Sequence, residues 1–118
     1  GAFTPTCSEK HLPSYVQHFE DFRSRGVEVF CVSVNDPFVM QAWGKTQHVP
    51  DGLQMLADGN ADLARALGLE MDASAYGMGV RAKRFALYAE DGVVKHVFVE
   101  APGEYKVSGA EHVLEQIG

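Results

Sequence analysis

One cysteine near the start of the chain stands where a thiol can become a nucleophile. Cys7 follows Thr4, Pro5 and Thr6 and comes directly before an amphipathic helical pattern. The unpaired N–H groups and the positive dipole end of a helix N-terminus stabilise an anion, so they favour the thiolate. An unperturbed cysteine, with a pKa of about 8.5, is only roughly 3% thiolate at neutral pH. The position therefore predicts a lowered pKa and a reactive sulfur at Cys7.

The residue three positions before Cys7 is Thr4 and not a second cysteine, so this is not a dithiol site. A threonine hydroxyl can donate a hydrogen bond to a thiolate and accept one from a substrate O–H. A thiolate with such a hydroxyl beside it suits nucleophilic displacement at an oxygen or sulfur atom.

Other cysteine chemistries fit the sequence poorly. A cysteine hydrolase needs a histidine base oriented by a third group, and no signature of one surrounds Cys7. A cysteine phosphatase loop needs an arginine six residues after the cysteine, where this chain has Pro13. A non-catalytic interaction module or an inactive fragment remains the open alternative.

Composition indicates one ordinary globular domain over residues 1–118, with 46% hydrophobic and 22% charged residues. No apolar run approaches the ~20 residues that a membrane-spanning helix needs. The net charge of −6 argues against a nucleic-acid partner. The one basic cluster, Arg81, Lys83 and Arg84, is short enough to serve a single anionic site.

Two cysteines, Cys7 and Cys31, do not make a disulfide framework, so we expect a reducing compartment. The cytoplasm is the predicted location, with an organelle open as well, since no targeting segment is visible. We expect no metal and no other cofactor, because the histidines lack the spacing of metal ligands: His11, His18, His48, His96 and His112.

Hydrophobic periodicity predicts alternating helices and strands. A helix with a kink near Pro13 runs from Cys7 to Gly26, and a strand over 27–34 has the apolar character of one buried on both faces. Asp91-Gly92 predicts a hairpin turn, and Ser108 with Glu111 predicts a capping box. The remaining expected elements are a helix over 37–46, a strand over 53–57, a helix over 61–67, a loop around 76–79, hairpin strands over 84–90 and 93–100, and a terminal helix.

This order predicts an α/β fold, a sheet with helices packed on it. A helix that begins at Cys7 needs a preceding strand to aim its thiol, and only six residues lie upstream. We therefore expect a domain that lacks its N-terminal strands.

Several segments, in order and spacing, resemble the type II peroxiredoxins, the peroxiredoxin-five-like group with plant, bacterial and peroxisomal members. The motifs are GAFTPTCS at 1–8, HLP at 11–13, VSVNDPFV at 32–39, AW at 42–43, ADG at 57–59 and RAKRFAL at 81–87. The resemblance covers the whole chain and implies a thioredoxin-like fold. It also implies reduction of hydrogen peroxide and alkyl hydroperoxides without a cofactor.

By motif, Cys7 matches the peroxidatic cysteine, Thr4 the site threonine, and Arg84 the guanidinium that completes the site. Arg84 cannot lose its charge, so we expect it to lower the Cys7 pKa and to bind the peroxide. Arg81 is the candidate supporting residue. The motif proline that precedes the glycine matched by Gly1 falls outside this chain.

The route by which oxidised Cys7 is reduced is less constrained. The stretch where some members carry a resolving cysteine, 104–109, has Ser108 and no thiol. Cys31 matches a cysteine of plant-type members, which makes it a candidate resolving residue, although a buried cysteine usually acts as a small hydrophobe. A helix of about 18 residues is ~27 Å long, which predicts sulfurs too far apart for a direct disulfide. We therefore expect an external thiol, with glutathione and glutaredoxin favoured over thioredoxin.

The resemblance further implies a homodimer that packs through surfaces near the active-site loops. Phe3 and the segment around Tyr76 could supply apolar area there.

Overall fold

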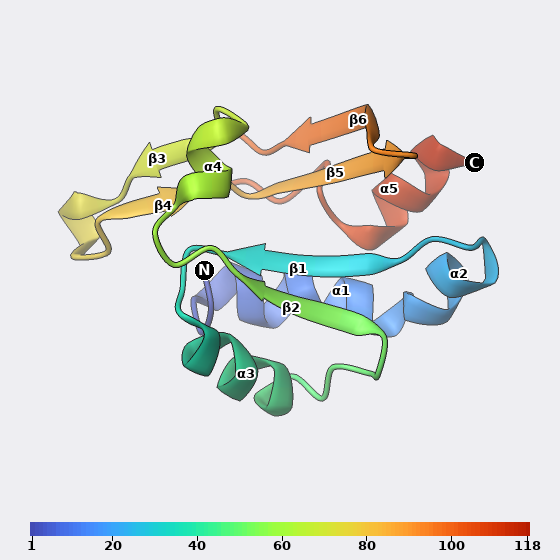
Figure 1. Cartoon of the computed structure of the whole chain (residues 1–118), viewed down its shortest axis with the longest axis horizontal. Coiled ribbons are helices and arrows are strands. Elements are labelled where there is room, and N and C mark those ends of the chain that lie inside the picture. Colours follow the sequence, from blue (N-terminus) through green and yellow to red (C-terminus); the bar gives the residue numbers. More distant parts are fainter.

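The computed structural model describes all residues, 1–118, and confirms the α/β prediction. The strands pair as three two-stranded sheets: β1 with β2 in parallel, β3 with β4 and β5 with β6 antiparallel. Helices lie against these sheets, and the N-terminus lies at the carboxyl end of β1 (Figure 1). The elements are η1 Cys7–His11, α1 Leu12–Gln17, α2 Phe19–Ser24, β1 Val29–Ser33, α3 Pro37–Thr46, β2 Leu53–Ala57, α4 Asp62–Ala66, β3 Glu70–Asp72, η2 Ser74–Tyr76, β4 Val80–Ala82, β5 Phe85–Glu90, β6 Val93–Val99 and α5 Ala110–Ile117.

The first helical stretch differs from the single kinked helix that the sequence predicts. It opens with a π-helical turn at Cys7–His11, continues as α1 with Pro13 in its first turn, and is interrupted at His18, where φ is −100° and ψ is 13°. The π-helical turn directly precedes Pro13, which lacks the N–H group that a regular helix would use to bond to that turn, and a second irregularity lies at His18. Gly26 follows in the left-handed conformation, with φ at +73°, as expected of a residue just beyond a helix end.

Helix α3 and strand β2 have the predicted bounds. The Asp36 carboxylate caps α3 by accepting a hydrogen bond from Val39 N at 2.8 Å, and Pro37 occupies the first turn. Asp91 and Gly92 both have positive φ, 50° and 77°, which confirms the Asp-Gly hairpin turn between β5 and β6.

The loop expected around 76–79 is present at residues 77–79, between η2 and β4, and it lies within a β3–β4 hairpin that the sequence did not predict. Two sequence-based expectations are wrong. Strand β1 is not covered on both faces, since Phe30 is 48% exposed. Ser108 does not cap the terminal helix: Gly109 is the N-cap residue, and the Ser108 hydroxyl donates to Glu100 Oε2 at 2.7 Å instead.

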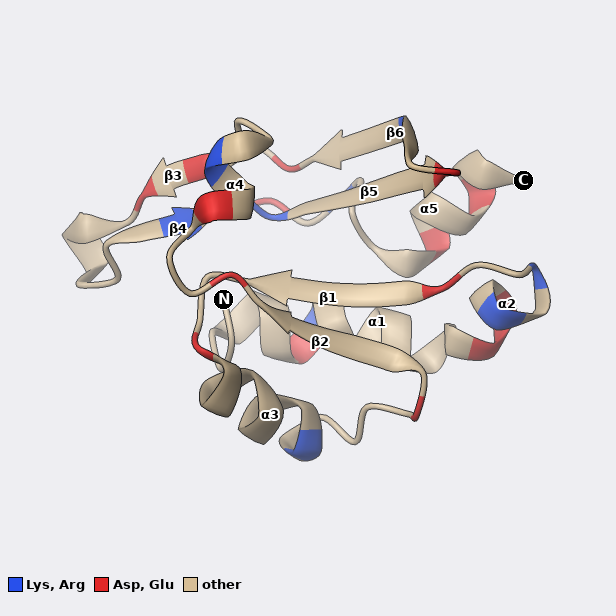
Figure 2. Ribbon diagram, viewed as in Figure 1, with Lys and Arg blue, Asp and Glu red and all other residues tan.

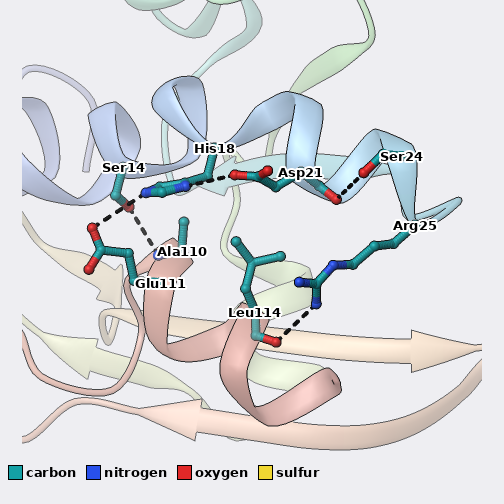
Figure 3. Close-up of polar contacts among 8 residues, drawn as sticks. All are labelled: Ser14, His18, Asp21, Ser24, Arg25, Ala110, Glu111 and Leu114. Carbon is teal, nitrogen blue, oxygen red and sulfur yellow. Dashed lines mark hydrogen bonds and ion pairs between the residues drawn. The ribbon is translucent and has the colours of Figure 1, made fainter.

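The terminal helix α5 is fastened to the first helices by side-chain contacts (Figure 3). Ser14 Oγ accepts from Ala110 N at 3.1 Å, and Arg25 Nη1 donates to Leu114 O at 3.1 Å. Apolar residues from both regions belong to the main buried cluster, among them Leu12, Phe22, Val113 and Leu114. This docking brings the segment just before α5 close to the start of the chain's first helix.

Candidate active site around Cys7

Cys7 is the first residue of the π-helical turn, half-buried and packed against the core. The preceding loop folds tightly: Thr4 N donates to Gly1 O at 3.2 Å, Ser8 N donates to Thr4 O at 2.9 Å, and Phe3 has a φ of 61°. Short π-helical segments are frequent at functional sites, because they present a side chain that a regular helix would place elsewhere.

Two polar anchors fix this loop on the rest of the fold. Asn35 Oδ1, at the end of β1, accepts hydrogen bonds from Ala2 N at 2.9 Å and from Ser33 Oγ at 2.6 Å. Trp43 on α3 is buried, 2% exposed, and its Nε1–H donates to Ser8 Oγ at 3.0 Å. The backbone on both sides of Cys7 is therefore held by β1 and α3.

The environment of Cys7 favours its thiolate. Burial alone would raise the pKa of Cys7, but a hydrogen bond from His11, the amino group of Gly1 and the Thr4 hydroxyl together lower this pKa to about 5. The Gly1 nitrogen lies 3.2 Å from Cys7 Sγ. When a residue precedes Gly1, this nitrogen is a peptide N–H that still donates but carries no charge.

His11 is the site residue that sequence reasoning missed. Its Nε2 donates to the backbone carbonyl of Ser108 at 3.1 Å, and its ring makes edge contacts with Tyr15 and Tyr105 at centroid distances of 5.7 and 5.8 Å. The sequence did hold a signal. His11 follows Cys7 by four residues, and side chains at that spacing lie on one helix face.

Thr4 lies where the sequence places it, beside Cys7. Its hydroxyl donates its single proton to Gly1 O at 2.6 Å. The same hydroxyl lowers the Cys7 pKa when its O–H turns to the sulfur instead. A hydroxyl whose proton is engaged with a carbonyl keeps lone pairs that can accept a hydrogen bond from a substrate.

The two arginines take different positions. Arg84 Nη1 donates to Glu104 O at 2.6 Å, and Arg84 Nε is buried without a hydrogen-bond partner. The Arg81 guanidinium packs against the Cys7 loop, because a Cβ placed on Gly1 would lie 2.8 Å from Arg81 Nη1. Neither arginine is among the causes of the Cys7 pKa shift, in contrast to the expectation for Arg84. The basic stretch from β4 to the start of β5 stands out among otherwise scattered Lys and Arg residues (Figure 2).

Cys31 lies in the middle of β1 and packs against the same core as Cys7. Burial, and to a smaller extent the charge of Cys7, raise the pKa of Cys31 to about 12. Strand β1 runs back beside the first helices toward the end of the molecule where the chain begins (Figure 1), so the helix length does not by itself measure the distance between the two sulfurs. That the two are too far apart for a direct disulfide stays a prediction. Both thiols are free.

None of the helices combines the length and the apolar character needed to cross a bilayer. No group of three or more His, Cys, Asp or Glu side chains is arranged to hold a metal ion.

Comparison with known proteins gives consistent matches along the chain. The family model described as Redoxin matches residues 1–114. Peroxiredoxin-2B of Arabidopsis thaliana is 48% identical over 118 residues, which are 99% of this chain and 73% of that protein. The chain spans about half, 51%, of the chloroplastic Peroxiredoxin-2E of the same plant, to which it is 45% identical.

Solved structures agree with these matches. Reduced Prx3 of Vibrio vulnificus in complex with H2O2 superposes with a TM-score of 0.94 at 47% identity, covering 100% of this chain and 76% of that one. Peroxiredoxin 5 of Alvinella pompejana has a TM-score of 0.86 at 36% identity, covering 99% and 73%. The likeness confirms the thioredoxin-like fold that the sequence resemblance implies.

Proposed function

Since this chain belongs to the peroxiredoxin family of thiol peroxidases, we propose that it reduces hydrogen peroxide and alkyl hydroperoxides with Cys7 as the peroxidatic nucleophile. The observation that carries the proposal is the environment of Cys7, where hydrogen bonding with His11, Thr4 and the Gly1 nitrogen lowers the Cys7 pKa. At neutral pH such a cysteine is almost entirely thiolate, the form that attacks peroxides. The complex of Vibrio vulnificus Prx3 with H2O2 supports hydrogen peroxide as one substrate.

In the proposed reaction the Cys7 sulfur attacks the nearer peroxide oxygen. The S–O bond forms as the O–O bond breaks, so the sulfur is oxidised to a sulfenic acid and the peroxide is reduced to water or an alcohol. The electron pair of the O–O bond leaves with the distal oxygen, which takes up a proton. The sulfenic O–H keeps the proton that the nearer oxygen carried.

Thr4 and Arg84 are the proposed partners of the peroxide. The Thr4 hydroxyl donates to Gly1 O, so its oxygen can accept the peroxide O–H and orient the attacked oxygen. Arg84 is the proposed donor to the oxygens on which charge develops, with Arg81 supporting the loop beside it. The buried, unpaired Arg84 Nε supports this role, since an unsatisfied buried donor gains a bond when an oxygen approaches it.

The direct test is stoichiometric oxidation. One equivalent of hydrogen peroxide should convert Cys7 to a sulfenic acid that a dimedone probe traps, far faster than it modifies Cys31. Cys7→Ser should lose peroxide consumption entirely. Unchanged thiols after peroxide addition to the folded protein would instead favour the alternative, a thioredoxin-like interaction module without catalysis.

We further propose that an external thiol reduces the sulfenic acid. Two thiols are needed: the first displaces water to form a mixed disulfide with Cys7, and the second releases the Cys7 thiol and leaves a disulfide of the reductant. Cys31 is half-buried and its pKa is raised to about 12, so it keeps its proton at neutral pH and is a poor internal nucleophile. Glutathione with glutaredoxin is the proposed reductant, with thioredoxin as the second candidate.

We also propose a homodimeric assembly. Phe3 is 53% and Tyr76 81% exposed, and both could be covered in a homodimer. Sedimentation analysis at high micromolar concentration tests this, because a strictly monomeric species contradicts it.

The cytoplasm is the proposed compartment, although relatives named as chloroplastic and mitochondrial also match the chain.

A further inference from the structure

An irregular segment before α5 accepts hydrogen bonds from side chains of the Cys7 site. We name residues 104–108 the carbonyl loop. Its Glu104 carbonyl accepts from Arg84 Nη1 at 2.6 Å, and its Ser108 carbonyl accepts from His11 Nε2 at 3.1 Å and from Tyr15 Oη at 2.7 Å. The orientation of His11 and of Arg84 therefore depends on where this loop holds its carbonyl groups.

One buried carboxylate holds the carbonyl loop from the other side. Glu100, 6% exposed, follows β6 directly. Its oxygens accept hydrogen bonds from Lys106 N at 2.8 Å, from Val107 N and Ser108 N at 2.9 Å, and from Ser108 Oγ at 2.7 Å. Three successive backbone N–H groups thus converge on one side chain, and with these donors engaged the peptide planes of the loop are fixed.

Glu100 is also tied to Arg84, which directly precedes β5. Glu100 N donates to Arg84 O at 2.9 Å, so the carboxylate, the loop and Arg84 form one connected unit. Burial alone would raise the pKa of Glu100, but the hydrogen bonds from Ser108 and the loop N–H groups lower it. The group is therefore an ionised acceptor at neutral pH, and an amide or apolar side chain could not accept all of these bonds.

We propose that Glu100 is a positioning residue for the peroxidatic site: it fixes the carbonyl loop so that Ser108 O orients His11 beside Cys7 and Glu104 O orients Arg84. The proposal rests on the assignment of Cys7 as the reactive thiol. Glu100 itself touches neither Cys7 nor substrate, and it acts through the loop.

The test compares Glu100→Gln in two backgrounds, the native chain and His11→Ala. The glutamine oxygen can keep some of the loop's bonds, but its amide N–H group must face a backbone donor, so the loop shifts. In the native background we expect the Cys7 pKa, measured from thiolate absorbance near 240 nm and from the pH profile of iodoacetamide alkylation, to rise by about one unit. In the His11→Ala background the same substitution should change the Cys7 pKa little, because the residue through which Glu100 acts is gone. Glu28→Gln, at an exposed position, is the matched control.

The double comparison separates positioning from general destabilisation. An equal pKa rise in both backgrounds, or none in the native one, overturns the proposal. If Glu100→Gln fails to fold, Ser108→Ala takes its place, since it removes only the hydroxyl bond to Glu100 and keeps the carbonyl that binds His11. Both readouts follow the thiol without peroxide, so a chain that proved inactive toward peroxide would refute the proposed function and leave this test intact.

Discussion

His11 and Ser108 are joined by a hydrogen bond of 3.1 Å between the imidazole Nε2 and the backbone carbonyl, although they are 97 residues apart in the sequence. This bond connects the first helical turn, which carries Cys7, to the segment that precedes the terminal helix. A carbonyl oxygen only accepts, so Nε2 carries a proton and the bond sets the plane of the ring. The ring can then donate to the Cys7 thiolate only when Nδ1 carries a proton as well.

The first prediction concerns this histidine. His11→Ala should raise the Cys7 pKa from about 5 by at least about one unit, because it removes the largest of the interactions that favour the thiolate. The pH profile of alkylation by iodoacetamide measures the change. His18→Ala is the matched control, since His18 pairs with Asp21 and Glu111 away from the thiol. Equal shifts in both variants would contradict the role of His11.

The second prediction is a pH dependence of stability. The pKa of Cys7 is about 5 in the folded chain and about 8.5 when unfolded, so the unfolded state binds more protons between these values. The stabilisation that the thiolate provides is complete above about pH 8.5, falls as the pH drops, and is lost below about pH 5.

Urea unfolding of the native chain and of Cys7→Ser measures this effect. The difference in unfolding free energy between the two should grow from pH 5 to pH 8.5. Cys31→Ser is the control: the pKa of Cys31 is raised, so its thiol is neutral in both states over most of this range. A difference between the native chain and Cys7→Ser that stays constant with pH would contradict the depressed pKa.

The sequence predicted the local elements well where one residue type dictates the backbone. Asp36 and Pro37 define the start of α3, and Asp91-Gly92 defines the hairpin, because each meets a specific conformational demand. The prediction that Ser108 caps the terminal helix is wrong because it considered only neighbours in the sequence. The Ser108 hydroxyl found a buried carboxylate eight residues earlier, a partner that only the folded chain brings near.

The same distinction applies to the site. Cys7 and Thr4 are only three positions apart in the sequence, so local spacing brings them close together. The influence of Ser108 on His11 depends on the docking of α5, which no local pattern encodes. The distance argument for Cys31 measured along the helix and left out the return of β1 beside it, so the separation of the two thiols stays a prediction.

The third prediction separates the two arginines. Arg84→Ala should slow peroxide consumption by about 10²-fold or more, as expected when a donor to developing oxygen charge is removed. Arg81→Ala should have a much smaller effect, because its guanidinium packs against the backbone at Gly1. Since neither arginine contributes to the Cys7 pKa shift, both variants should keep a Cys7 pKa near the native value. Stopped-flow rates and thiolate titration test the two statements separately, and similar small rate effects for both variants would remove Arg84 from the site.

The last prediction concerns the second thiol. Resolving a sulfenic acid requires a thiolate, and burial raises the pKa of Cys31 to about 12, so very little of it is ionised at neutral pH. Oxidation of Cys7 to a neutral sulfenic acid would remove the smaller, electrostatic part of that shift and leave the burial in place. We therefore expect Cys31→Ser to retain most of its turnover with glutathione and glutaredoxin, and mass spectrometry after one equivalent of peroxide to find a Cys7 sulfenic acid or its glutathione adduct. A Cys7–Cys31 disulfide as the main product, with turnover lost in Cys31→Ser, would mean that β1 opens during the cycle and that Cys31 is the resolving residue after all.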